Sequence, residues 1–512
     1  MVKQTISSRL PKIDHMHFRP ALCSFALLGA TSSFAQFPGT TTPPPADLKK
    51  GWDSISISQA KSILTFLANE CDGRGSGAPG FQKAADFVAA HFKAWGLKPF
   101  GDNGTYFQNV PFTVTHFQDE GSYIELIGSS KVIPAGDGFR YTGLTANQLV
   151  TGVLAVLKVT GDSVDLSNTN LRGKIVLVYT DKAPTTALRA AITRLAPATA
   201  LFVSASVPPI SYSAQPSGGA ARRGGRPAYG TISTATADAM VKDLTLTPGA
   251  ADEAKGATVQ YSKGLVRVQA KVFSGPVAVP NVVAMLEGSD PTLKSEYIGI
   301  GGHLDHLGKQ GTVVYPGADD DGSGSTAVLS IAHAMVLNPK KPKRSIIFMT
   351  FCGEELGLIG SSWYVAHPKA PHKQMVAELQ MDMVARDSYG PQNNDPNRMD
   401  VEKDNLDTMR LVGSKRISTD LDNVIQDVNK SIGFRFKYDA EDVYTRSDHY
   451  NFARNGIPIA FLFDGFTPDY HQPGDTIDKI DFLKLTNAAK LYYLTAYAVA
   501  DHAEPPRHDV KQ

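Results

Sequence analysis

After residue 280 the sequence alternates short apolar runs of β type with longer amphipathic runs. The apolar runs are "YIGIGGH" at 297–303, "SIIFMTF" at 345–351, "VAELQMDMV" at 376–384 and "IPIAFLF" at 457–463. Helical patterns follow at 323–337 and 481–501. Strands that alternate with helices predict an α/β fold with a largely parallel sheet covered on both faces. Sites in such sheets form where the strands end at their carboxyl edge.

Polar side chains follow these runs at five places. A lone histidine, an aspartate run at a helix start or a single buried aspartate is usually structural when taken alone. Five such places at one sheet edge would converge, and that many carboxylates would repel unless cations neutralised them. The places are His303 with Asp305, the aspartates 319–321, Glu354 with Glu355, Asp382, and His471.

The donor types indicate a metal centre. A catalytic zinc takes about three protein ligands and a water, so two histidines and at least three carboxylates exceed the needs of one ion. Five ligands, one of them bridging, suit two metals roughly 3.5–4 Å apart. Imidazole with carboxylate favours Zn²⁺, with Mn²⁺ or Co²⁺ as substitutes. Asp305 is placed to orient the His303 ring from its far nitrogen.

The adjacent glutamates Glu354 and Glu355 follow a buried strand. Successive side chains that leave a strand point to different sides, so one glutamate can bind metal while its neighbour faces the attacking water. That neighbour would act as general base and pass the proton to the leaving amine.

Composition limits the class of protein and its compartment. Lys plus Arg is 51 and Asp plus Glu is 50, which argues against nucleic-acid binding. The stretch 17–36 predicts a signal peptide cut after Ala35, with Met16 as an alternative start, and hence a periplasmic or extracellular protein. No later run predicts a membrane span. Cys71 and Cys352 would remain after cleavage, too few for a zinc–thiolate site, and Cys352 is expected to be buried and inert.

Composition and predicted secondary structure divide the rest of the chain into segments. Residues 36–50 are rich in Pro and Thr and predict a linker, followed by helices near 58–69 and 81–96. Residues 128–275 read as an inserted, strand-rich domain. The expected catalytic domain is therefore discontinuous, 51–127 with 276–505, and 506–512 form a tail.

Six motifs in this order resemble one family: "HLDHLG", "GADDDGSG", "CGEELGLIGS", "MDMV", "SDHYNFARNGIP" and "YHQPGDT". They are similar to those of the secreted co-catalytic zinc aminopeptidases, which are related to glutamate carboxypeptidase and the transferrin receptor. The stretch from Gly73 is similar to the N-terminal part of that family, and the insert, including "RGKIVLVY", resembles a protease-associated domain. The resemblance spans about residues 50 to 500.

The resemblance implies two Zn²⁺ ions per chain and peptide substrates. It makes Asp320 the bridging ligand, Glu354 the general base and Tyr470 a stabiliser of the oxyanion. It also implies a cis peptide between Asp320 and Asp321. The implied metal ligands are His303, Asp320, Glu355, Asp382 and His471.

Two other functions stay open. A related carboxypeptidase, dipeptidase or aminoacylase shares the ligand order, although in that group the extra domain typically follows the glutamate pair, whereas here it precedes His303. A binding protein on an inactive scaffold predicts lost ligands, and none is missing. The oligomeric state is not indicated by the sequence.

Four further residues near the motifs receive structural roles. His306 and His449 are expected to stabilise loops rather than to bind metal. Arg386 and Arg446 are expected to form salt bridges or supporting contacts rather than to hold a substrate carboxylate.

Overall fold

The computed structural model describes residues 37–161, 165–217, 229–249, 256–387, 390–392, 395–400, 405–438 and 441–509. The side chains of 390–392 and 395–400 are not described. The predicted signal peptide, residues 1–35, lies outside the described residues. No described helix combines the length and the apolar character needed to cross a membrane.

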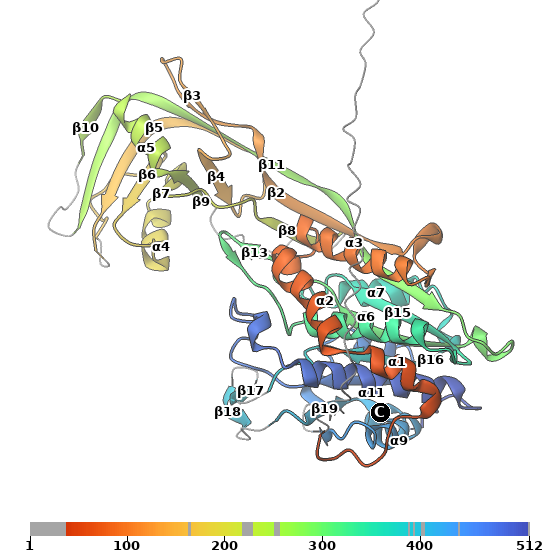
Figure 1. The fold of residues 1–512 in the computed structure, drawn as a ribbon. Coiled ribbons are helices and arrows are strands. Elements are labelled where there is room, and N and C mark those ends of the chain that lie inside the picture. The colour runs from red at the N-terminus through yellow and green to blue at the C-terminus, as the bar shows by residue number, and fades with distance from the viewer. Residues whose placement is uncertain are drawn as a thin grey trace, which may run out of the picture. The chain divides into compact units, whose positions relative to one another are not determined.

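A mixed sheet forms the centre of the predicted catalytic part (Figure 1). Strands β15 (Ser345–Phe351), β12 (Tyr297–His303), β16 (Met375–Met381) and β21 (Ile459–Phe463) are parallel neighbours in that order. The end of β11 (Ala257–Leu286) pairs antiparallel with β15 on one side. On the other side β19 (Thr408–Val412) runs antiparallel to β21 and parallel to β20 (Arg435–Lys437). The prediction of a largely parallel sheet is thus confirmed.

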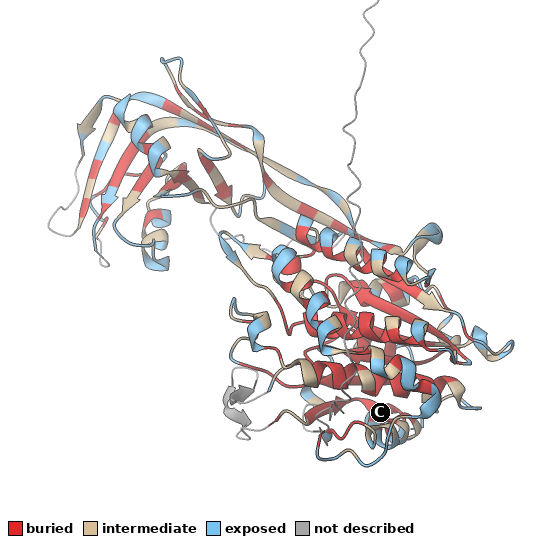
Figure 2. Ribbon diagram, viewed as in Figure 1, coloured by how far each residue is buried: buried red, intermediate tan, exposed pale blue. Residues whose placement is uncertain are grey.

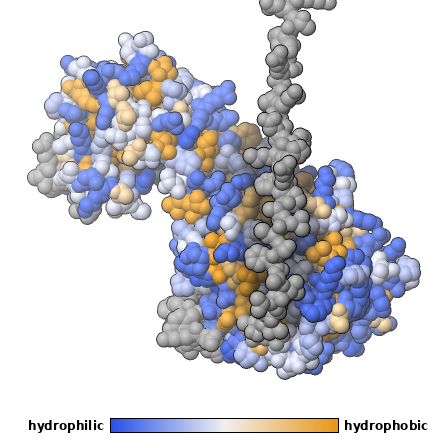
Figure 3. Space-filling model, in the orientation of Figure 1, coloured by the Kyte–Doolittle hydropathy of each residue, from blue (hydrophilic) through white to orange (hydrophobic). Residues whose placement is uncertain are grey.

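The strands are apolar on both faces because helices cover both. Ile346 and Phe348 of β15 enter one hydrophobic cluster, whereas Ile347 and Met349 enter another on the opposite face. Strands β12, β15, β16 and β21 are buried over nearly their whole length (Figure 2). The face drawn in Figure 3 mixes hydrophilic with apolar residues.

Helices pack on both sides of this sheet. One face is covered by α1 (Lys49–Ser54), α2 (Ile57–Glu70), α3 (Pro79–Ala94), α6 (Gly322–Leu337), α9 (Thr419–Asn429) and α11 (Phe482–Asp501). The other face is covered by α7 (Ile359–Ala366), α8 (Ser414–Ile417) and α10 (His449–Ala453). Helix α6 is buried almost all round and α11 over most of its length. Both begin at an aspartate that caps backbone N–H groups, Asp321 and Asp481.

Two long strands connect the catalytic sheet with the strand-rich middle of the chain. Strand β2 (Phe107–Leu126) pairs antiparallel with β11 from Val282↔Phe107 to Val266↔Leu126. Strand β11 crosses the boundary predicted at 275, whereas β2 ends at Leu126, just before the boundary predicted at 128. The boundary predicted at 275 therefore falls inside one continuous ladder. The exact division into domains stays a prediction.

The strand-rich part has its own hydrophobic clusters, separate from those of the catalytic sheet. Its strands β5, β6, β7 and β9 run parallel to one another in that order. The elements are β3 (Val132–Pro134), β4 (Phe139–Thr142), β5 (Gln148–Val159), β6 (Ile175–Thr180), α4 (Thr186–Arg194), β7 (Thr199–Ser204), β8 (Tyr212–Pro216), β9 (Tyr229–Ser233), α5 (Thr234–Lys242) and β10 (Leu246–Pro248). Three small pieces complete the described strands: β1 (Lys98–Pro99), the hairpin β13 (Lys309–Gln310) with β14 (Val313–Val314), and the pair β17 (Gly390–Gln392) with β18 (Asp395–Asp400).

The segment predicted as a linker packs on the catalytic part in its described residues. Phe37 is buried against Phe434, and the Thr41 backbone N–H donates to the carbonyl of Lys430 at 2.8 Å. The Pro/Thr composition gave no sign of these contacts, because they depend on residues almost 400 positions away.

A buried arginine ties three segments together next to the aspartate loop. Arg74 is fully buried, and its guanidinium donates to the carbonyls of Leu304, Pro316 and Gly317 at 2.7–2.8 Å. It also reaches the carbonyl of Leu67 at 3.2 Å. The fork of an arginine supplies these diverging donors, which a lysine ammonium cannot do from one point.

The substitution Arg74→Lys is therefore expected to lower the free energy of unfolding by about 3 kcal/mol, since several buried carbonyls lose a charged donor. Urea unfolding of the metal-free protein measures this. Arg507→Lys is the matched control, because Arg507 pairs with Asp420 at an exposed site and its loss should leave stability unchanged. Equal midpoints for the two variants would contradict the assigned role.

Candidate metal centre

The site lies at the carboxyl ends of the parallel strands, as predicted. His303 is the last residue of β12 and is paired in register with Phe351, the last residue of β15. Asp382 directly follows β16, and the glutamate pair follows β15. The loop from Gly317 to Asp321 leads into α6 beside them, and its Asp320–Asp321 peptide bond is cis, which confirms that prediction.

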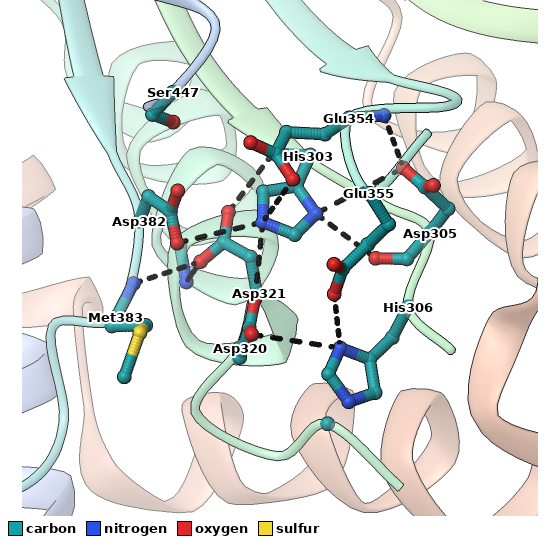
Figure 4. A network of polar contacts seen from close by, with 12 residues as sticks. His303, Asp305, His306, Asp320, Asp321, Glu354, Glu355, Asp382, Met383 and Ser447 are labelled. Carbon is teal, nitrogen blue, oxygen red and sulfur yellow. Dashed lines mark hydrogen bonds and ion pairs between the residues drawn. The ribbon is translucent and has the colours of Figure 1, made fainter. Parts of the chain in front are cut away.

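The first set of donor atoms meets around His303 Nε2 (Figure 4). His303 Nε2 lies 3.2 Å from Asp320 Oδ1 and 3.4 Å from Asp382 Oδ1. These three buried residues offer ligand atoms close enough together to hold one metal ion. We call them the first ligand group.

The second set surrounds the other oxygen of Asp320. His471 Nε2 lies 3.2 Å from Asp320 Oδ2 and 3.0 Å from Glu355 Oε2. We call Asp320, Glu355 and His471 the second ligand group. Asp320 therefore belongs to both groups, each through a different oxygen, as the bridging role predicts.

His306 also lies at the second ligand group, which the sequence analysis did not predict. Its Nδ1 is 2.7 Å from Glu355 Oε1 and 3.7 Å from Asp320 Oδ2, and these three residues could hold a metal ion. The loop-stabilising role predicted for His306 stays a prediction, while its ring lies against two residues of the second ligand group. Its spacing of three residues after His303 was the one signal in the sequence that could have found it.

The two adjacent glutamates face different neighbours, as predicted. Glu355 lies among the imidazoles of the second ligand group, whereas Glu354 lines a cavity together with His303 and Asp382. The Glu354 carboxylate is 3.9 Å from His303 Nε2, and its backbone N–H donates to Asp305 Oδ1 at 3.1 Å. Glu354 is thus placed beside the candidate metal positions without being part of either ligand group.

The contact that orients His303 differs from the predicted one. His303 Nδ1 donates to the backbone carbonyl of Asp305 at 2.9 Å, while the Asp305 carboxylate is 3.9 Å away. The carboxylate accepts from the Glu354 backbone instead. The consequence for metal binding is the same, because a proton on Nδ1 leaves the lone pair of Nε2 for an ion.

Two aspartates fix the loops of the site, a role that the sequence analysis assigned to neither. Asp321 accepts from the backbone N–H groups of His303, Gly324 and Met383 at 2.9–3.2 Å, which joins β12, α6 and the end of β16. Asp475 accepts from the backbone of Asp319 and Asp320 at 3.1 Å. These contacts hold the bridging carboxylate in place.

The cavity at the site measures about 30 Å³ and has one apolar wall. A larger hollow of about 520 Å³ elsewhere on the described surface is lined by no histidine, so size alone does not select the site. Tyr470 stacks on His471 with ring centroids 3.9 Å apart and receives a hydrogen bond from Arg446 at 3.1 Å. The apolar wall consists of Met383, Val443, Phe461, Phe463 and Phe466.

Protons are held tightly by the imidazoles among these carboxylates. Burial opposes a charge on His303, but Asp382 and Glu354 outweigh it and raise the pKa of the imidazole well above its ordinary value. Burial likewise opposes a charge on His471, yet Asp320 and Glu355 raise its pKa to about 10. For Asp320, burial would raise the pKa, but the three surrounding imidazoles lower it well below the ordinary value.

The pKa values of Glu354 and Glu355 are shifted in opposite directions. Burial raises the pKa of Glu354 well above its ordinary value, and the neighbouring carboxylates Glu355 and Asp382 add to that effect. Burial also acts on Glu355, but His306 and His471 outweigh it and lower its pKa. Neighbouring carboxyl groups whose pKa values are moved apart are typical of an acid–base residue beside a ligand.

The donors present fit zinc. Asp320 Oδ2, Glu355 Oε1 and both ring nitrogens of His306 are buried and have no hydrogen-bond partner within the described part of the chain. Buried polar atoms normally have a partner, so these atoms indicate a ligand position. Imidazole nitrogen and carboxylate oxygen are donors that zinc takes in proteins.

The remaining sequence predictions near the site are confirmed. His449 is buried and donates from Nε2 to the carbonyl of Tyr444 at 2.8 Å. Arg386 pairs with Asp469 at 2.9 Å. Cys352 is buried and unpaired by disulfide, and burial raises the pKa of its thiol well above the ordinary value.

Relatives by sequence are aminopeptidases and metalloproteases. A "Probable leucine aminopeptidase" of Arthroderma otae is 34% identical over 232 residues, 43% of this chain and 58% of that protein. A "Probable zinc metalloprotease" of Pyrenophora tritici-repentis is 29% identical over 267 residues, 45% of this chain and 59% of that protein. The matched part thus spans less than two thirds of the length of either relative.

Solved structures with a similar chain include an aminopeptidase from Aneurinibacillus sp. strain AM-1. It is 20% identical, with a TM-score of 0.47, and covers 91% of this chain and 98% of its own. An aminopeptidase from Legionella pneumophila, LapA, is 27% identical over 44% of this chain and 57% of its own, with a TM-score of 0.35.

Residues 281–496 match the model of Peptidase family M28. All five predicted ligands, the predicted base and Tyr470 lie inside this range, as does His306. The predicted resemblance to the zinc aminopeptidases is confirmed for this part of the chain, which matches the model of Peptidase family M28.

Proposed function

We propose that the protein is a zinc-dependent aminopeptidase that removes N-terminal residues from peptides. The single observation that supports this most is the pair of ligand groups that share Asp320, with Glu354 beside them but outside both. A site for one metal ion would need no carboxylate that belongs to two ligand groups. A structural metal site would need no glutamate that lies beside the ligands without binding the metal. The family match over residues 281–496 and the names of the curated relatives point to the same activity.

Two zinc ions would be held by the first and second ligand groups. When bound, such a pair supplies Lewis-acid chemistry, which lowers the pKa of water and polarises a carbonyl group. Glu354 takes the proton of the attacking water and gives it to the leaving amine. The raised pKa of its carboxyl suits a group that must both accept and return a proton near neutral pH.

In this proposal Tyr470 stabilises the oxyanion, and its contacts support that role. Arg446 donates to the Tyr470 oxygen, so the tyrosine hydroxyl keeps its own proton for a second acceptor. Burial raises the pKa of Tyr470, followed by the charges of Asp320 and Glu355, so the hydroxyl stays protonated. Its stacking on His471 fixes the ring at the rim of the cavity.

The apolar wall of the cavity favours an apolar side chain at the cleaved terminus. Phe461 and Phe463 project from the same face of β21, and Phe466 follows them. The relatives named leucine aminopeptidase agree with this preference. The alternative is a metallocarboxypeptidase, and the observation in its favour is that Arg446 also lines the cavity.

Export and the insert belong to the proposal as well. The predicted cleavage after Ala35 would deliver the enzyme to the periplasm or the medium, where peptides are available. The insert would be a protease-associated-like domain. The support is a pair of hydrophobic clusters that come mostly from residues 128–275, joined by Phe117, Ile124 and Leu126 of β2.

Replacement of the proposed base is expected to separate chemistry from metal binding. Glu354→Gln should keep its zinc and lose about 10²–10⁴-fold in kcat, because the isosteric amide cannot accept the proton. Elemental analysis and steady-state kinetics measure the two effects. Glu355→Gln is the matched control one residue away and should instead lower the zinc content. A fully active Glu354→Gln enzyme would mean that the base is another residue.

Zinc binding is expected to release protons and to strengthen as the pH rises. The pKa of His471 is about 10 in the metal-free fold against an ordinary value of 6.5. The stability that its charge contributes to the metal-free protein is therefore complete below pH 6.5 and is lost as the pH rises through about 10. Zinc must displace that proton, so its affinity rises across the same interval.

Calorimetric titration with zinc near neutral pH, in two buffers of different ionisation enthalpy, measures the proton release directly. The account predicts different heats in the two buffers. Identical heats would show that the imidazoles are already neutral, which contradicts the charged cluster.

A substrate panel tests the reaction class. Leucine amide should be cleaved, and its kcat/KM should exceed that of glycine amide at least about tenfold, since the apolar wall contacts the larger side chain. N-acetylated peptides should be resistant, chelation should abolish activity, and added zinc should restore it. Release of C-terminal residues from N-acetylated peptides would instead establish the carboxypeptidase.

A further inference from the structure

We propose that His306 is a sixth ligand residue and binds the metal of the second ligand group through Nδ1, together with Asp320, Glu355 and His471. The inference rests on the proposed two-metal centre and adds a residue to it. It makes the two metal positions unequal, since one has a single imidazole and the other has two.

The His306 ring is buried and lacks the partners that a structural histidine has. Its exposed fraction is 2%, and neither ring nitrogen has a hydrogen-bond partner within the described residues. His449, a buried structural histidine nearby, donates to a backbone carbonyl instead. An imidazole that is closed off from water and has no hydrogen-bond partner on either nitrogen is unfavourable unless something else binds it.

The distances suit ligands of one ion. Donor atoms that bind one tetrahedral zinc at about 2.0–2.2 Å lie about 3.3 Å from one another. His306 Nδ1 is 2.7 Å from Glu355 Oε1 and 3.7 Å from Asp320 Oδ2. His471 Nε2 lies at 3.0 and 3.2 Å from the same two residues. Both imidazoles therefore approach the same pair of carboxylates at similar distances.

The backbone holds the ring in this position. The His306 N–H donates to the carbonyl of Arg74 at 3.2 Å. The aspartate loop packs on the ring from the other side, where a Cβ on Gly317 would lie 2.5 Å from His306 Cγ. Gly317 also has a φ of +56°, so a glycine is needed there on both grounds. The ring cannot move away from Glu355 without moving this loop.

The rival role is that of a hydrogen-bond donor that orients Glu355. Nδ1 and Glu355 Oε1 are close enough for such a bond at 2.7 Å, yet the N–H direction does not form one. In Figure 4 His306 and Glu355 approach each other beside Asp320. Two donor atoms that bind the same ion also lie close together without a hydrogen bond between them.

Paramagnetic NMR of the dicobalt protein tests the proposal without any measurement of activity. Each histidine bound to Co²⁺ gives one strongly shifted, exchangeable ring N–H signal in H₂O. The wild-type protein should show three such signals, from His303, His306 and His471. His306→Gln should show two such signals. Its affinity for the zinc ion of the second ligand group should also fall roughly 100-fold or more, which is at or beyond the largest loss seen when a residue that only supports a metal ligand is replaced.

The variants separate the two roles of His306. Glutamine can still donate a hydrogen bond to Glu355, so unchanged zinc affinity and an unchanged signal count in His306→Gln would overturn the proposal. His333→Gln is the matched control for loss of an imidazole, since His333 contacts Gln59 at 2.7 Å, away from the site. It should keep all three signals.

The wild-type spectrum decides the matter even if His306→Gln does not fold. Three signals support ligation by His306, and two signals overturn it while leaving the two-metal centre intact. A protein that takes up no pair of cobalt ions would contradict the proposed function itself, which is a different result.

Discussion

The structure depends on the neutralisation of a set of buried carboxylates that meet at one edge of the sheet. Asp320, Glu354, Glu355 and Asp382 lie close together because their strands and loops end at the same place. Like charges at such distances are compatible with folding only if positive charge lies among them. In the metal-free protein, protonated imidazoles supply that charge, because the surrounding carboxylates raise the pKa values of His303 and His471. Two divalent cations would place more positive charge among these carboxylates than the imidazoles do.

The scaffold around the cluster consists of backbone hydrogen bonds to buried charged side chains. Arg74 donates to carbonyls on one side of the aspartate loop, and Asp475 accepts from N–H groups on the other. Asp321 joins three elements at its N-terminal cap of α6. Asp320, Glu355 and His471 lie in loops rather than in strands. The contacts of Arg74, Asp321 and Asp475 hold those loops at the end of the sheet.

The fold class and the five places where candidate ligands gather could be predicted from the sequence because they follow from short-range rules. Which residue at each place is a ligand was implied only by the resemblance to the zinc aminopeptidases. The alternation of apolar and amphipathic runs gives the parallel strands, and strand ends collect polar groups. The orientation of side chains in loops does not follow from such rules. The sequence placed Asp305 near the His303 ring, but whether its carboxylate or its carbonyl contacts the ring depends on how the chain turns there. His306 joined the cluster for the same reason, since the loop after β12 brings it to Glu355. The long β2–β11 ladder was also hidden, because each strand's partner lies about 150 residues away.

The central claim is that the two oxygens of Asp320 bind two different metal ions. Anomalous diffraction at the zinc absorption edge, from crystals grown with zinc, tests it most directly. The account predicts two peaks about 3.5–4 Å apart, one beside His303 and Asp382 and one beside Glu355 and His471. A single peak, or none within bonding distance of Asp320, would contradict it.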